Sequence, residues 1–145
     1  MKKIILGFIG EPNSGRTTAA NILKKKGFHI VSLNSKVEEF AKHLFPEGDM
    51  EDNREVILGN IRERGCSVHK EYWLNLVLIS VPDSKNFIVF DDISMAEASN
   101  KKIIAYQIYR PGISTVKLPD IDTIVNDGTI KEFTEKIKDL YKSIV

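Results

Sequence analysis

The sequence predicts an α/β protein in which helices cover both faces of a parallel sheet. Short apolar runs alternate with segments of helical periodicity along nearly the whole chain, which is the pattern of such a fold. The first apolar run, Ile4–Ile9, leads through the glycine-bounded loop Gly10–Thr17 into a helical segment, Thr18–Lys26. Polar residues such as Asp91 and Arg110 follow later apolar runs. Ligands of parallel sheets bind at the carboxyl ends of the strands, so a polar site is expected there.

The predicted strands are short, as expected for a small sheet that is buried on both faces. After the first run they comprise Phe28–Ser32, Phe87–Phe90, Ile103–Ile108 and Ile121–Val125. We therefore expect a sheet of roughly five parallel strands in a three-layer α/β/α arrangement.

The later helices are predicted from apolar residues that recur every three or four positions. They comprise Lys36–Leu44, about Asn53–Arg64, about Lys70–Ser80, a short helix at Met95–Asn100, and Ile130–Ile144. Pro46–Asp49 should break the first of these helices, and Gly65 should stop the second. The apolar face around Trp73 could pack inside the chain or against a second copy, so a homodimer stays open.

Composition limits the classes of protein and partner. A chain of 145 residues that is 42% hydrophobic can bury one core, so a single domain spanning 1–145 is expected. The formal net charge of +1 gives no general attraction to nucleic acid or to membrane surfaces. No apolar stretch reaches the length of a membrane span. The only cysteine, Cys66, excludes an internal disulfide and fits a reducing, cytoplasmic location.

The loop Gly10–Thr17 fits the phosphate-binding pattern G-x-x-x-x-G-K-[ST] at every defined position except one, where Arg16 replaces lysine. In such a loop, backbone N–H groups and the following helix N-terminus hold a polyphosphate, and the threonine binds Mg²⁺. This context predicts the P-loop NTPase fold with ATP and Mg²⁺ as cofactors. An ordinary glycine-rich turn that binds nothing is the alternative. The residues expected to bind the triphosphate are Gly10, Asn13, Ser14, Gly15, Arg16, Thr17 and Thr18.

Carboxylates and cations elsewhere supply the rest of a phosphoryl-transfer site. Asp91, at the tip of an apolar strand, could hold Mg²⁺ together with Thr17, or orient an attacking oxygen. The alternative is that Asp91 and Asp92 are turn residues. Transfer between nucleotides also needs cations around the migrating phosphate. The candidates are Arg54, Arg62, Arg64 and Arg110, with a solvated surface position as the alternative for each.

A series of short segments along nearly the whole chain resembles the deoxynucleoside monophosphate kinases of bacteriophages. The resemblance rests on Gly10–Thr18, Gly27-Phe28, Ser32, Arg54, Trp73, Phe90-Asp91, Glu97, Arg110–Gly112 and Asn126–Thr129. It implies transfer of the γ-phosphate of ATP, with Mg²⁺, to the 5′-phosphate of a deoxynucleotide, in the host cytoplasm if a phage encodes the protein. The resemblance implies that Gly15, Arg16 and Thr17 hold ATP and the metal, and that Asp91 is the strand-tip carboxylate. Arg54 would belong to the monophosphate side, and Arg110 would lie near the base or phosphates of ATP. The expected catalytic residues are Arg16, Asp91 and Arg54.

The chain departs from that family at three cationic positions. Arg16 stands for the loop lysine, Ile93 for an arginine after the strand tip, and Glu38 for a lysine near the start of a helix. Loss of one preorganised cation at a transferring phosphate costs about 2.7–4 kcal/mol of transition-state stabilisation. Two functions therefore remain open: an active nucleotide kinase, and a degenerate kinase fold that binds nucleotides for regulation or structure. A P-loop hydrolase or another small-molecule kinase is a third alternative.

Overall fold

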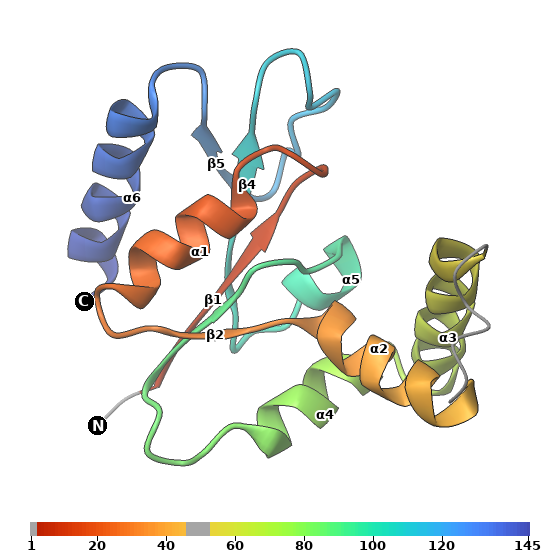
Figure 1. Cartoon of the computed structure of the whole chain (residues 1–145). Coiled ribbons are helices and arrows are strands. Elements are labelled where there is room, and N and C mark those ends of the chain that lie inside the picture. Colours follow the sequence, from red (N-terminus) through yellow and green to blue (C-terminus); the bar gives the residue numbers. More distant parts are fainter. Residues whose placement is uncertain (1–2, 46–52) are drawn as a thin grey trace. The chain divides into compact units, whose positions relative to one another are not determined.

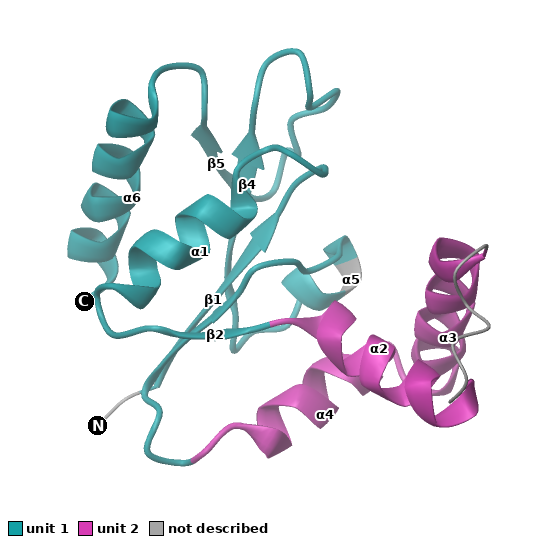
Figure 2. Ribbon diagram, viewed as in Figure 1, with its two compact units in different colours: residues 1–31, 83–145 teal, residues 32–82 magenta. Residues whose placement is uncertain are grey.

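The computed structural model describes residues 3–45 and 53–145, and the chain divides into two compact units (Figure 2). Unit 1 comprises residues 1–31 and 83–145, and unit 2 comprises residues 32–82. The expectation of one domain over 1–145 stays a prediction. The predicted helix break at Pro46–Asp49 lies outside the described residues.

Unit 1 is built on a five-stranded sheet in the order β2-β3-β1-β4-β5 (Figure 1). All four strand pairs are parallel, so the predicted five-stranded parallel sheet is confirmed. The strands are β1 (Ile4–Ile9), β2 (His29–Val31), β3 (Phe87–Phe90), β4 (Ile104–Tyr109) and β5 (Asp122–Val125). The ends of every strand lie within one residue of its predicted run, and β2 is shorter by one residue at each end.

Helices cover one face of this sheet, and the main hydrophobic core of unit 1 lies between these helices and the strands. Leu6 and Phe8 of β1 point to this face, where α1 (Arg16–Lys24) and α6 (Ile130–Ile144) pack beside each other. The strongly amphipathic sequence of α6 buries one stripe of apolar side chains and leaves its charged side chains exposed, as its periodicity predicts. Buried core residues from the helices are Ala19, Ala20 and Leu23 of α1 and Phe133, Ile137 and Leu140 of α6.

The opposite face of β1 is covered by the segment that leads into α5 (Met95–Ala98). Residues alternate between the two faces of a strand, so Gly7 points away from Leu6 and Phe8. A Cβ at Gly7 would run into the side chain of Ile93 and lie 3.1 Å from Ile103 Cγ2. Unit 1 alone therefore has helices on both faces of its sheet, which confirms the predicted α/β layering.

The strand order creates a switch point beside β1. The connection that leaves β1 runs toward the β2 edge of the sheet, whereas the connection that leaves the neighbouring β4 runs toward β5. In open α/β sheets, the crevice between two such carboxyl ends is where ligands bind. The loop that begins at Gly10 directly follows β1, and Arg110 directly follows β4. The topology therefore brings both to this crevice.

Unit 2 consists of three helices: α2 (Leu33–Leu44), α3 (Arg54–Val68) and α4 (Tyr72–Ser80). Ser32 caps α2 by accepting a hydrogen bond from Ser35 N–H. The prediction that Gly65 stops the second helix is wrong, because α3 continues to Val68. Gly65 is instead a packing position: a Cβ there would lie 2.6 Å from Trp73 Nε1 and 2.8 Å from Tyr72 Cδ1.

We expect Gly65→Ala to lower the free energy of unfolding by about 1–3 kcal/mol, the usual cost of overpacking a tight contact. The added methyl group would displace the Trp73 indole, whose Nε1–H donates to the Arg62 carbonyl at 2.9 Å. The matched control is Gly59→Ala on the same helix, where a Cβ meets nothing within 4 Å. Urea denaturation should show the control unchanged or stabilised, and equal effects of the two substitutions would contradict the packing role.

Among the residues that the structure describes, no helix combines the length and apolar character needed to cross a membrane.

Candidate functional site

The loop between β1 and α1 is held by backbone conformations that few residue types adopt. Gly15 has φ +115°, and Asn13 is in the left-handed region with φ 70°. Gly10 packs under the loop, since a Cβ there would lie 2.5 Å from Ser14 Oγ and 2.9 Å from the Ile108 carbonyl oxygen. Both glycines of the sequence pattern are thus required by the geometry of the loop.

The loop ends at the N-terminus of α1, which begins at Arg16 rather than at the predicted Thr18. Its N-cap residue, Gly15, makes no side-chain cap, and its first turn holds no acidic residue. Serine or threonine caps are present on α2, α5 and α6. The first N–H groups of α1 have no acceptor within the helix and carry partial positive charge. The N-terminus of α1 therefore offers donors to an anion.

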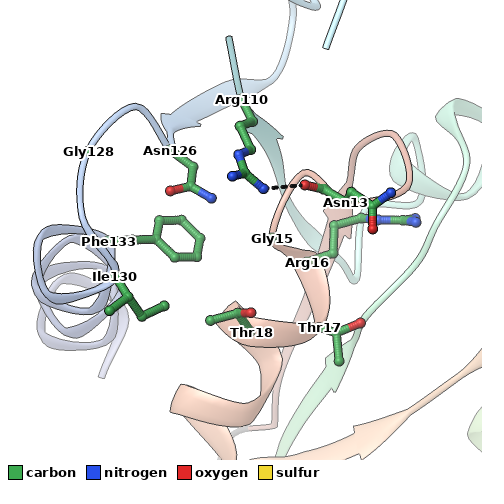
Figure 3. Close-up of a pocket in the computed structure, with 10 residues that line it drawn as sticks. All are labelled: Asn13, Gly15, Arg16, Thr17, Thr18, Arg110, Asn126, Gly128, Ile130 and Phe133. Atoms are coloured by element: carbon green, nitrogen blue, oxygen red, sulfur yellow. Dashed lines mark hydrogen bonds between the residues drawn. The ribbon is translucent and has the colours of Figure 1, made fainter. Parts of the chain in front are cut away.

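A cavity of about 400 Å³ opens over this helix N-terminus (Figure 3). It is lined from three segments far apart in the sequence: the loop with the start of α1, the end of β4, and the β5–α6 connection. Six of the predicted nucleotide-binding residues line it, namely Asn13, Gly15, Arg16, Thr17, Thr18 and Arg110. The other two, Gly10 and Ser14, lie in the loop itself; Ser14 is fully buried, and its Oγ has no hydrogen-bond partner among the described residues.

The two ends of the cavity differ in chemistry. In Figure 3, Phe133 and Ile130 of α6 lie on one side, beside Asn126. The side chains of Arg16 and Thr17 extend away from these residues. One end is therefore partly apolar, and the other presents a cation and a hydroxyl.

Arg110 ties the segment after β4 to the loop. Its Nη1–H donates to the Asn13 carbonyl oxygen at 3.0 Å (Figure 3). Nearby, Glu11 Oε1 accepts from both the N–H and the Oγ1–H of Thr115, at 3.2 and 3.0 Å. The acidic side chain of the loop is thereby hydrogen-bonded to the post-β4 segment.

Asn126 is a site residue to which the sequence assigned no role. Its Nδ2–H donates to the Ser14 carbonyl oxygen at 3.0 Å, across 112 positions of the chain. The signal for it was the turn-forming sequence Asn126–Thr129 directly after a strand, where polar residues reach the carboxyl edge of the sheet. Nothing in the sequence indicated that Phe133, a buried position of an amphipathic helix, also lines the cavity.

We expect Asn126→Ala to weaken ATP binding by about two- to tenfold, as one neutral hydrogen bond contributes about 0.5–1.5 kcal/mol. Without the amide, the Ser14 carbonyl loses its donor and the loop loses its link to the β5–α6 connection. Calorimetric titration with Mg-ATP measures the change, with Asn21→Ala on the exposed side of α1 as the control. Equal affinities in the two variants would show that this link does not shape the loop.

Asp91 follows β3, the neighbour of β1 in the sheet. Its Oδ1 is buried and has no hydrogen-bond partner among the described residues. Within that part of the chain, no group of three or more histidine, cysteine, aspartate or glutamate side chains could hold a metal ion by itself. Mg²⁺ needs no such cage, because one or two carboxylates and the substrate phosphates commonly bind it. Thr17 lines the cavity, whereas Asp91 is not among its lining residues, so their shared part in Mg²⁺ binding stays a prediction.

The three arginines predicted on the middle helix, Arg54, Arg62 and Arg64, all lie on α3 of unit 2. Arg54 begins α3, and its Nη2 pairs with Glu38 Oε1. Arg62 Nη1–H donates to Asn34 Oδ1 at 2.7 Å. Arg54 belongs to unit 2, so its predicted catalytic part stays a prediction.

Two residues after the strand tip have structural roles. Ile93, where the resembled family has an arginine, is buried over Gly7. Glu97 is 1% exposed and forms a capping box with Ser94, accepting from the Ser94 N–H at 2.8 Å. The chain thus uses this segment to cover the sheet.

The sequence matches no protein-family model and no curated protein at a significant level. Its structure is similar to the crystal structure of TT1252 from Thermus thermophilus, with a TM-score of 0.61 and 16% sequence identity over 100% of both chains. A mutant of the APS kinase CysC from Mycobacterium tuberculosis aligns over 97% of this chain and 98% of its own, at 16% identity and a TM-score of 0.47. That score is too low to support a conclusion. The likeness to TT1252 shows the α/β fold, and the glycine-bounded loop at the switch point of the parallel sheet is where P-loop proteins carry their phosphate-binding loop.

Proposed function

We propose that this protein is a kinase that transfers the γ-phosphate of ATP to a deoxynucleoside monophosphate. The observation that carries the proposal is the uncapped N-terminus of α1 at the floor of the cavity, with Arg16 and Arg110 among the lining residues. Backbone donors and two cations in one concave site match the charge of a triphosphate. The acceptor class rests on the order of segments that resembles the phage kinases.

The different chemistry of the two ends of the cavity supports one orientation of ATP. The adenine ring belongs at the partly apolar end, against Phe133 and Ile130, with the Asn126 amide nearby. The γ-phosphate then belongs near Arg16 and Thr17. Bound Mg²⁺ would neutralise charge on the phosphates, with Thr17 and Asp91 as its protein ligands.

The chain's own residues would act by positioning and charge stabilisation, which is most of phosphoryl-transfer catalysis. The backbone N–H groups of α1 orient the phosphates, and Arg16 stabilises the charge that develops on the transferring group. Arg110 fixes the loop through the Asn13 carbonyl, so the donors are in place before the nucleotide binds.

A binding protein without transfer is the second candidate, and a specific contact favours it. Arg54, the predicted cation on the monophosphate side, forms a salt bridge with Glu38. Glu38 itself stands where the resembled family has a lysine. Ile93 stands where the family has an arginine, so a second cation is missing. The acceptor phosphate would then meet less positive charge than in an active kinase.

Incubation with Mg-ATP and each of the common deoxynucleoside monophosphates, followed by product chromatography, separates the two candidates. The kinase proposal expects the diphosphate of at least one nucleotide. If none forms while Mg-ATP still raises the melting temperature, the binding protein is the correct alternative.

A further inference from the structure

Unit 2 contains a cavity of about 350 Å³ of its own, which we call the ring cavity. It lies between α2, α3 and the start of α4, and its surface is mostly apolar. The residues that line it include Phe40, Arg64, Val68, Tyr72 and Trp73. Its volume is within the range of small-molecule sites.

Flat aromatic rings form one wall of the ring cavity. The Trp73 indole is 2% exposed, and its Nε1–H donates to the Arg62 carbonyl, so its orientation is fixed. The rings of Phe40 and Tyr72 stand nearly perpendicular to it, with centroids 6.2 and 5.0 Å away. Gly65 has no side chain, and this lets the rings of Trp73 and Tyr72 pack directly against α3. Such a wall favours a flat ring as ligand, by stacking and edge contacts.

The lining of the ring cavity also carries a positive charge. Arg64 lines the ring cavity and is exposed. No acidic side chain among the described residues forms a salt bridge with it. A guanidinium that keeps its charge available binds carboxylate or phosphate in a forked geometry. The exposed side chains of Leu44 and Val68 leave the cavity open to a ligand from solvent.

We propose that the ring cavity is a second ligand site, which binds a flat aromatic or heteroaromatic ring that carries an anionic group. The ring would lie against the exposed Phe40, next to the buried Trp73, and the anion would pair with Arg64. A nucleoside monophosphate and a separate aromatic acid share this chemistry. The proposal concerns binding alone and does not depend on ATP or on transfer.

The chain supplies its own reporter, because Trp73 is its only tryptophan. The full chain is titrated with phenyl phosphate and with cyclohexyl phosphate, which carries the same anion on a puckered ring, while Trp73 emission is followed. We expect a saturable change with phenyl phosphate, and binding about tenfold weaker with cyclohexyl phosphate because the stacking is lost. Val68→Glu places a negative charge in the lining of the ring cavity and should weaken the binding of phenyl phosphate at least about fivefold.

The matched control is Val56→Glu, on the same helix and outside the ring cavity; Val56 and Val68 are 63% and 80% exposed. It should change phenyl phosphate binding less than about twofold. The proposal is overturned if no saturable change occurs up to about 10 mM, a limit weaker than any specific site. The proposal is also overturned if phenyl phosphate and cyclohexyl phosphate bind with equal affinity. Equal affinities of Val68→Glu and Val56→Glu for phenyl phosphate would overturn it as well.

Competition identifies the source of the ligand. Deoxynucleoside monophosphates that displace phenyl phosphate in the wild type, and fail to do so in Val68→Glu, make the site one for nucleotides. If they do not compete while phenyl phosphate still binds, the site belongs to a separate aromatic acid. A protein that binds phenyl phosphate but transfers no phosphate would refute the kinase proposal and leave the ring cavity supported.

Discussion

Arg16→Ala is expected to lower the rate of phosphoryl transfer by about a hundred- to a thousandfold, the cost of removing one preorganised donor at a transferring group. Arg16 opens α1 and lines the cavity over its N-terminus. The affinity for ATP should fall far less, by about tenfold, because the backbone donors of the loop remain. Steady-state kinetics for kcat and calorimetry for ATP affinity measure the two effects separately.

Two further variants sharpen this result. Lys24→Ala, at the opposite end of α1, removes a cation of the same helix and should leave kcat unchanged. Arg16→Lys should raise turnover if arginine misplaces the transferring phosphate, since lysine acts as a compact point charge. An Arg16→Ala enzyme with the wild-type kcat would show that this side chain does not stabilise the transferring group.

Gly15→Ala is expected to lower the free energy of unfolding by about 2–4 kcal/mol and to weaken ATP binding at least about tenfold. Two effects add: a side chain in a left-handed conformation costs about 1–2 kcal/mol, and a new collision arises. The added Cβ would lie 2.7 Å from Asn126 Nδ2 and 3.3 Å from Phe133 Cε2. Relief of that contact breaks the hydrogen bond from Asn126 to Ser14 and shifts the loop.

Gly27→Ala separates these two effects. Gly27 also has a positive φ, of +99°, but a Cβ there meets nothing within 4 Å. This control should lose only the conformational part of the stability and keep its affinity for ATP. Thermal unfolding and Mg-ATP titration of both variants provide the comparison. If Gly15→Ala and Gly27→Ala bind ATP equally well, the loop does not hold the triphosphate in the way proposed.

The sequence predicts the framework of unit 1 well, because its elements follow from local pattern. β1 at Ile4–Ile9, β3 at Phe87–Phe90 and α6 at Ile130–Ile144 have the predicted bounds. The two strands are uninterrupted apolar runs, and α6 has a clear apolar stripe with polar flanks. The position of the loop follows equally directly, since the pattern of glycines fixes where β1 ends.

Features that depend on distant contacts were not predictable. Gly65 resembles a helix stop, yet α3 continues through it because Trp73 and Tyr72 occupy the space of its side chain. The contribution of Asn126 to the loop depends on a contact across 112 positions. The pairing of Arg54 with Glu38 joins two helices that the sequence alone does not bring together. Each of these depends on the tertiary fold rather than on local periodicity.

We propose above that the loop and the N-terminus of α1 bind the triphosphate of a nucleotide. Isothermal titration calorimetry of the protein with Mg-ATP tests it most directly, with the Gly15→Ala variant measured beside the wild type. We expect saturable binding of one ATP per chain, weakened at least about tenfold in the variant. No detectable heat with ATP or any other common nucleoside triphosphate, or equal binding by the variant, would contradict it.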